Sequence, residues 1–247
     1  MSYPMSKKNN KITILHEDDH LVVLNKPAHV LSIPDRYIAE RLNLVDFLKE
    51  RYEDIFVVHR LDKETSGVIC YAKTAEAHRH LNKQFEARTT QKIYQVIVEG
   101  HPVEASGIID KPISRHLSIA GKMRIHKSGK PSITHYEVKE AIGAYSLLHA
   151  DIKTGRTHQI RIHFASIGHP LLVDKMYGRQ EAFFLSSLKQ KKYNLGKDQE
   201  ERPLMSRTSL HSWQLRLDHP DSGERMEFTA PLPKDFSAVV KQLRKWA

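Results

Sequence analysis

The alternation of apolar and polar positions predicts short strands along most of the chain. Residues 11–15 and 21–25 are apolar runs around an acidic turn at 17–20, which is the pattern of a hairpin. Two more apolar runs, at 55–58 and 68–72, are joined by a polar loop. Further runs of strand-forming residues lie between glycine and proline turns, at 93–98, 118–126, 133–139, 145–152, 210–217 and 225–229.

Three segments have the spacing of helices. Residues 42–52 and 235–246 place apolar side chains on one face, and Thr74 is a suitable N-cap for a helix that ends near Arg88. With the strands, they predict an α+β fold in one domain over residues 1–247. We expect residues 1–10 to be a flexible N-terminus, and 189–207 to be an exposed insertion with helical character at 183–191.

The segment around Arg161 fits two structures. Alternation of Thr157, Gln159, Arg161 and His163 is typical of a strand. A Thr157 N-cap, an apolar stripe and a stop at Gly168 favour a helix instead. We favour the helix, in whose first turns the Arg161 guanidinium can engage a carboxylate through two hydrogen bonds.

Composition indicates a globular protein without a membrane span. Of the 247 residues 40% are hydrophobic and 28% charged, and no apolar run approaches the roughly 20 residues that cross a bilayer. The start lacks the apolar core of a signal peptide. Cys70 is the single cysteine and lies in an apolar run, so we expect a buried thiol and a reducing, cytoplasmic location.

The net charge of +10 favours a polyanionic partner, and nucleic acid is the commonest one. The alternative is an enzyme with an ordinary basic surface. Sixteen histidines suggest a metal site at first. The five-residue spacing of His158 and His163 suits neither one face of a helix nor one face of a strand, so we expect no metal.

Asp62 is the main candidate for chemistry. It lies in the polar loop between the runs 55–58 and 68–72, within His-Arg-Leu-Asp and just before Thr-Ser-Gly. Such residues also form ordinary turns, in which the carboxylate only caps nearby N–H groups. A loop between two buried strands is equally a common place for reactive groups.

This loop resembles the catalytic loop of the RluA family of RNA pseudouridine synthases. Other segments resemble the family in the same order along residues 11–232: Asn25–Pro27, Lys92–Val96, Thr154–Arg161, Gly168–Gly178 and Leu210–His211. The chain departs from the family at His29, where a glycine is usual, and at the 189–207 insertion. The ten residues before Lys11 leave no room for the N-terminal S4 domain of some relatives, so we expect a member without it.

The resemblance implies the pseudouridine synthase fold, a central, mostly antiparallel mixed sheet flanked by helices and loops with a catalytic cleft. It implies an isomerase that converts uridine in tRNA, rRNA or both to pseudouridine, with no cofactor and no metal. The substrate partner is then RNA, with no membrane, and we expect a monomer.

The resemblance also implies which residues act. Asp62 is the catalytic aspartate, Arg161 the arginine that pairs with it, and Tyr94 the tyrosine beside the base. Asp62 can attack the sugar, attack the base or remove a ribose proton, and the sequence leaves these open. The RNA-binding and base-flipping residues are His59, Arg60 and Leu210, with Arg60 filling the space of the flipped base.

Two other classes compete with this interpretation. A non-catalytic RNA-binding or ribosome-assembly protein of the same fold is disfavoured because Asp62 is present. A metal-dependent nuclease is disfavoured by the lack of ligand spacing.

Overall fold

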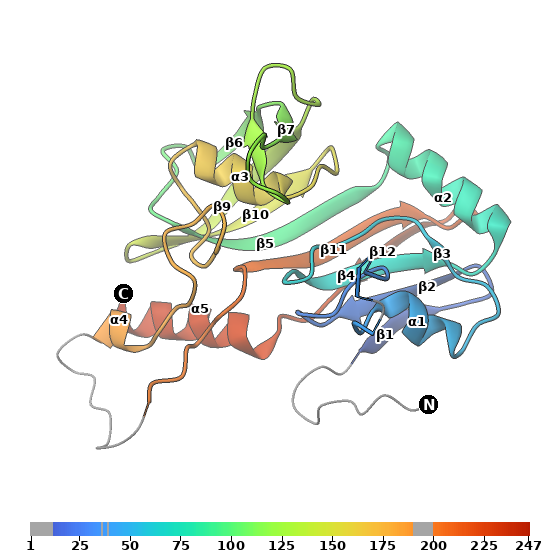
Figure 1. Cartoon of the computed structure of the whole chain (residues 1–247), viewed down its shortest axis with the longest axis horizontal. Helices are drawn as coiled ribbons and strands as arrows, with labels where there is room; N and C mark the ends of the chain where they lie inside the picture. The colour runs from blue at the N-terminus through green and yellow to red at the C-terminus, as the bar shows by residue number, and fades with distance from the viewer. Residues whose placement is uncertain (1–11, 36, 39, 190–199) are drawn as a thin grey trace. The chain divides into compact units, whose positions relative to one another are not determined.

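The structure, a computed structural model, describes residues 12–35, 37–38, 40–189 and 200–247 (Figure 1). Backbone contacts divide the chain into two units, residues 1–90 with 214–231 and residues 91–213 with 232–247. The predicted α+β class is confirmed, and both units contain antiparallel strand pairs, as expected. That residues 1–247 act as one domain stays a prediction. The predicted flexible N-terminus and most of the predicted insertion lie outside the described residues.

The first unit is built on an antiparallel sheet in which β2 (Leu21–Lys26) lies between β1 (Thr13–Glu17) and β4 (Ser66–Ala72). The short β3 (Phe56–Val57) also pairs with β4. β11 (Leu210–Asp218) enters this unit from the second one and pairs there with β12 (Arg225–Thr229). The unit's helices are α1 (Leu44–Lys49) and α2 (Ala75–Ala87).

The core of the first unit explains why β4 is so apolar. All seven β4 residues are buried, and Val68, Cys70 and Ala72 pack with Leu21 and Val23 of β2 against the apolar stripe of α2. The expectation of a buried Cys70 is confirmed, and burial raises the pKa of its thiol to about 12. β4 is therefore a fixed frame for the loop that precedes it.

The predicted limits of α2 are confirmed in detail. The Thr74 hydroxyl accepts the N–H of Ala77 and begins the helix. Arg88 ends it in the left-handed conformation, with φ 59°. The first helix was also correctly predicted, although it is shorter and Asn43 is its N-cap.

The second unit contains the antiparallel order β5 (Gln91–Glu99), β10 (Tyr145–Ile152), β9 (Ile133–Ile142) and β6 (Ser106–Asp110). β7 (Ile113–Arg115) and β8 (Met123–Ile125) form a separate hairpin. Its helices are α3 (Gln159–Ser166), α4 (Ser186–Lys189) and α5 (Lys234–Trp246), and α3 and α5 cover opposite faces of the sheet (Figure 1). No helix in the described ranges is long and apolar enough to cross a membrane.

Two local predictions in this unit are wrong. Residues 118–126 are not one strand, because the chain reverses between β7 and β8 through Gly121, whose φ is +74°. The helix over 159–166 is correct, but Thr157 does not cap it. His158 holds the N-cap place at φ 55°, and the Gln159 side chain instead accepts the N–H of Arg156.

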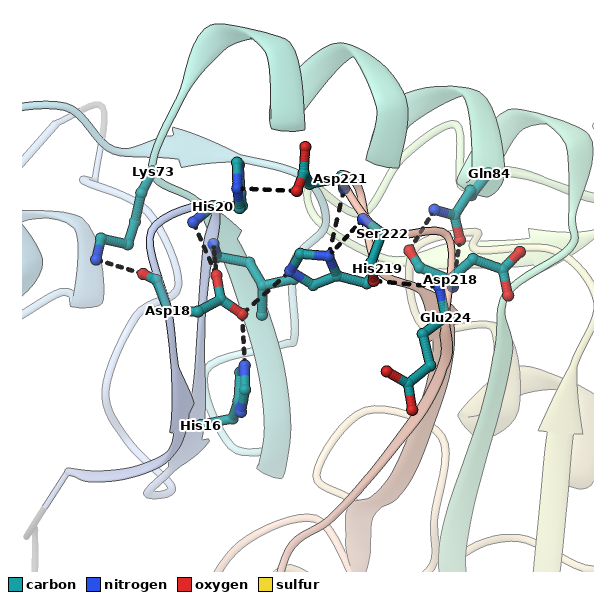
Figure 2. Close-up of polar contacts among 11 residues, drawn as sticks. His16, Asp18, His20, Lys73, Gln84, Asp218, His219, Asp221, Ser222 and Glu224 are labelled. Atoms are coloured by element: carbon teal, nitrogen blue, oxygen red, sulfur yellow. Dashed lines mark hydrogen bonds and ion pairs between the residues drawn. The ribbon is translucent and has the colours of Figure 1, made fainter.

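Histidines join two turns of the first unit through one carboxylate. Figure 2 shows His16 and His219 directed at Asp18, with Nε2–Oδ2 distances of 2.6 and 3.2 Å. Asp18 also accepts the backbone N–H groups of His20 and Leu21. Burial acts to raise the pKa of Asp18, but the hydrogen bonds from His16 and from the two N–H groups outweigh it, and the pKa falls to about 2. The β1–β2 turn is thereby tied to the turn after β11.

This carboxylate predicts a pH dependence of stability. A pKa below the ordinary 3.8 means that Asp18 stabilises the fold above about pH 4, and that this contribution is lost as the pH falls toward 2. We expect Asp18→Asn to lower the free energy of unfolding at pH 7 by about 1 kcal/mol, since a charged acceptor is lost. The difference from wild type should shrink near pH 3 in urea titrations. Asp221→Asn, which removes an exposed carboxylate 3.6 Å from His20, is the control and should have little effect.

Candidate functional site

Asp62 lies in the loop between β3 and β4 and is half-buried. Its carbonyl accepts the N–H of Thr65 at 3.1 Å, so the backbone turns directly after it. This bond is made by the backbone of Asp62, and capping by its carboxylate stays a prediction. The contacts of the two neighbouring residues show what else holds this carboxylate in place.

Ser32 fixes the residue before Asp62. Its hydroxyl donates to the Leu61 carbonyl at 2.9 Å and accepts the Leu61 N–H at 3.0 Å. Ser32 is 3% exposed, and its own carbonyl accepts the hydroxyl of Tyr71, a buried residue of β4. One serine therefore satisfies both main-chain groups of Leu61 and connects them to the core.

Lys26 fixes the residue after Asp62. Its ammonium is fully buried and donates to three carbonyls, those of Pro27, Val30 and Lys63. The Lys63 carbonyl also accepts the N–H of His29 at 2.7 Å. A buried ammonium is costly unless it is hydrogen-bonded, so these three carbonyls compensate its charge while holding the loop. Asp62 is thus anchored through main-chain atoms on both sides.

His29, which stands where the family usually has glycine, adopts a backbone conformation typical of glycine. Its φ of 68° is the left-handed conformation that glycine adopts without cost. His29 adopts this conformation, which directs its backbone N–H at the Lys63 carbonyl.

His59 and Arg60, predicted to bind RNA, differ in their surroundings. The His59 ring stacks on Phe85 of α2 at 5.0 Å, and its Nε2 accepts the N–H of Cys70. These contacts fasten the start of the loop to α2 and β4. Arg60 is exposed. The RNA-binding role of both stays a prediction.

Arg161 makes a two-pronged ion pair with Asp174 in the second unit. Its Nε and Nη2 each lie 2.7 Å from a carboxylate oxygen, and both side chains are almost fully buried. Burial acts to raise the pKa of Asp174, but the Arg161 guanidinium and the N–H groups of Met176 and Tyr177 outweigh it and lower the pKa. The sequence predicted that Arg161 engages a carboxylate bidentately, and it does so with Asp174, while its pairing with Asp62 stays a prediction. Guanidinium has five N–H donors, so this pair does not exhaust it.

Tyr94 and Leu210 also belong to the second unit. Tyr94 lies on β5 opposite Ala150 of β10 and is 6% exposed. Leu210 begins β11 and is buried, and its carbonyl accepts Nη1 of Arg207. Each residue is therefore held on a strand, while its role in the site stays a prediction.

The structure brings His59, Arg60 and Asp62 together in one loop, with Lys26 and Ser32 as anchors that the sequence had not singled out. It also adds Asp174, which lies within the motif Gly168–Gly178 and pairs with Arg161. A signal for Asp174 was available, because a charged residue directly after the apolar run 171–173 requires a buried partner. No comparable signal marks Ser32, whose partner is 29 residues away.

No group of three or more histidine, cysteine or acidic side chains with metal-binding geometry occurs among the residues described. His163 instead contacts the Thr134 hydroxyl and the Lys111 carbonyl, and burial lowers its pKa.

Comparison with known proteins identifies the family. The profile of the RNA pseudouridylate synthase family matches residues 20–166, which contain Asp62, Tyr94 and Arg161. The chain belongs to this family. The resemblance found in the sequence motifs is thereby confirmed.

Two similar members of the family come from bacteria. The ribosomal large subunit pseudouridine synthase D of Nitrosomonas europaea is 38% identical over 239 residues, which cover 94% of this chain and 65% of that protein. The protein of the same name from Pseudomonas aeruginosa is 37% identical, over 95% of this chain and 72% of its own length. The chain thus spans about two thirds of the length of these relatives.

Solved structures of the family share the fold. Human RNA pseudouridylate synthase domain containing 4 superimposes with a TM-score of 0.72 at 25% identity, over 94% of this chain and 92% of that one. Human RNA pseudouridylate synthase domain containing 1 superimposes with a TM-score of 0.70 at 26% identity, over 95% of both chains. The expected pseudouridine synthase fold is confirmed.

The Ser32 anchor can be tested directly. Ser32→Ala leaves the buried main-chain groups of Leu61 without their partner, so we expect a loss of about 1–3 kcal/mol in the free energy of unfolding. Proteolysis should also become faster within the Asp62 loop. Ser132→Ala is the matched control, because Ser132 is equally buried and donates to the Lys130 carbonyl in the other unit. Equal cleavage of the loop in both variants would contradict the role given to Ser32.

Proposed function

We propose that this protein isomerises uridine in RNA to pseudouridine, with Asp62 as the catalytic carboxylate. The observation that carries the proposal is the family match over residues 20–166, with Asp62 in a loop whose flanking residues are both anchored. The net charge of +10 suits an RNA substrate. Since the named bacterial relatives are ribosomal large subunit enzymes, we propose large-subunit rRNA as the first substrate to examine, with tRNA as the second.

The reaction is an isomerisation within one nucleotide. The N1–C1′ bond breaks, the uracil turns, and C5 bonds to C1′, while C5 loses a proton and N1 gains one. A carboxylate serves this chemistry by attack on the sugar or base, or by removing a ribose proton. Precise placement of Asp62 through its neighbours' main chain suits any of these roles, because reacting atoms must be held close and aligned.

Arg161 and Tyr94 complete the proposed set. Arg161 would hold the Asp62 carboxylate ionised and oriented, as the family resemblance implies, while its other edge is held by Asp174. Tyr94 would place its ring on the uracil and its hydroxyl near C5. Both side chains start from buried positions on regular elements, which limits their motion.

A uridine stacked in folded RNA must first leave the stack, at a cost of a few kcal/mol. We propose the exposed Arg60 as the residue that fills the vacated space, since a planar guanidinium stacks well on bases. Leu210 is proposed as a wall of the uridine pocket, and His59 as support for Arg60. We further propose a monomer in the cytoplasm, where the single buried Cys70 suits a reducing compartment.

The deciding experiment is pseudouridine formation by the purified protein without added metal. RNA with tritium at C5 of uridine releases label when C5 bonds to C1′, so release measures the reaction. We expect Asp62→Asn to abolish release while RNA affinity stays within about threefold, because one neutral replacement removes no phosphate contact. Release by Asp62→Asn at the wild-type rate would refute the role of Asp62, and a wild type inactive on both rRNA and tRNA would refute the proposed function.

The Arg161–Asp174 pair gives a second test. Asp174→Asn leaves a buried guanidinium without its counter-charge, so we expect a loss of about 3–5 kcal/mol in stability. The rate of pseudouridine formation at saturating enzyme should fall at least tenfold, since Arg161 is no longer oriented. Leu243→Ala, in the α5 core, should cost about 2–5 kcal/mol and serves as the stability-matched control. A similar fall in rate for both variants, measured where both are folded, would mean that the pair only stabilises the fold.

A further inference from the structure

Tyr177 contacts two separate parts of the second unit. The Arg161 guanidinium carbon lies 5.1 Å from the centre of the Tyr177 ring, within the range of a cation–π contact. The Tyr177 hydroxyl accepts the N–H of Met123 in β8 at 2.7 Å. One side chain thus contacts both the site arginine and the β7–β8 hairpin.

The hydroxyl has a second contact that fixes its position. It lies 2.9 Å from Nδ1 of His158, the residue that precedes α3 in the left-handed conformation. The Tyr177 N–H is bonded to Asp174, the partner of Arg161. Gly178 closes this turn by donating to the Asp174 carbonyl, and a Cβ there would lie only 2.7 Å from that oxygen. Tyr177 therefore cannot shift without disturbing Asp174 or the start of α3.

The hairpin and its flanks have the composition of an RNA-binding element. Residues 111–130 contain no acidic residue, and their Lys and Arg residues are Lys111, Arg115, Lys122, Arg124, Lys127 and Lys130. Leu117, at the turn, is 81% exposed. Cations beside an exposed apolar side chain suit an RNA strand, which offers phosphates and base faces.

Lys122 connects this charge to the same tyrosine. Its ammonium lies 5.7 Å from the centre of the Tyr177 ring, so one ring faces a cation of the hairpin and the guanidinium of Arg161. RNA bound by the hairpin would bias the position of Met123 and Lys122, and hence of the ring that supports Arg161. One contact chain from the hairpin to Arg161 thus passes through Tyr177, and β8 also packs on α3 itself.

We propose that Tyr177 is a positioning residue that couples RNA binding by the β7–β8 hairpin to the placement of Arg161. This inference rests on the proposed function and deepens it by giving the hairpin a part in turnover as well as in affinity. The Tyr177 hydroxyl contacts the hairpin through the Met123 N–H, and the Tyr177 ring contacts the Arg161 guanidinium.

The test is a double-mutant cycle on the full chain, with tritiated large-subunit rRNA transcript as the probe. One change is Tyr177→Phe, which keeps the ring and removes the hydroxyl. The other is Arg115→Ala with Lys127→Ala, which removes two exposed cations, one at the end of β7 and one just after β8. Filter binding gives Kd over a range of salt, and single turnover at saturating enzyme gives the rate.

We expect the hairpin variant to lower the slope of log Kd against log salt by about two, one for each phosphate contact. It should also slow the saturating rate about fivefold, a coupling of ordinary size for residues linked by contacts. Tyr177→Phe should slow the rate about as much and leave Kd within about twofold. The combined variant should bind as weakly as the hairpin variant but react no more slowly than Tyr177→Phe alone.

Rate losses that multiply in the combined variant, or a Tyr177→Phe variant with the wild-type rate, would overturn the coupling. Tyr136→Phe is the matched control, because Tyr136 packs on Phe164 of the same helix α3 at 5.8 Å. It should keep the wild-type rate and Kd, and a rate loss equal to that of Tyr177→Phe would also overturn the proposal. A wild type without activity on rRNA or tRNA would overturn the proposed function and this inference together, whereas additive losses in an active enzyme overturn only the coupling.

Discussion

The geometry around Asp62 depends on the hydrogen bonds that the buried ammonium of Lys26 donates to main-chain carbonyls. A cation removed from water has to be surrounded by acceptors, and here the acceptors are carbonyls from the end of β2 and from the Asp62 loop. The need to compensate one charge therefore holds two chain segments together. Ser32 makes the complementary contact on the other side of Asp62.

The second unit applies the same principle with ion pairs. Arg161 with Asp174, and Arg207 with Asp235, are both bidentate, and each arginine is almost fully buried. Buried pairs contribute little net stability compared with apolar residues, but they define orientation because misaligned charges are costly. Arg161 and the start of β11 at Leu210 are fixed in this way.

The sequence predicted most regular elements because their signals are local. Thr74 and Arg88 limit α2 as expected, and β10 and β12 begin and end where the alternation does. The sequence failed where a residue suits a structural position by type but its neighbour takes that position. Thr157 is a good N-cap by type, but His158 takes the capping position, and the Gln159 side chain accepts the N–H of Arg156 in the segment before α3.

The candidate site contains residues that motifs predicted and residues that no local pattern marks. Motif resemblance predicts Asp62, Arg161 and Tyr94 as site residues, because the proposed chemistry restricts the residue types at these positions. Lys26 and Ser32 bond to carbonyls that lie 37 and 29 residues further along the chain. A single sequence does not indicate which distant residues pair in this way. Their partners are main-chain atoms, which have no residue type for a pattern to detect.

The main-chain character of these anchors has an evolutionary consequence. Lys26, Ser32 and the His29 N–H all contact backbone atoms of Leu61 and Lys63, and none of these bonds requires a particular side chain at those two positions. The exposed Lys63 side chain can therefore change during divergence without moving the carboxylate beside it. The surface of this loop can therefore vary while the main-chain anchors that hold Asp62 stay the same.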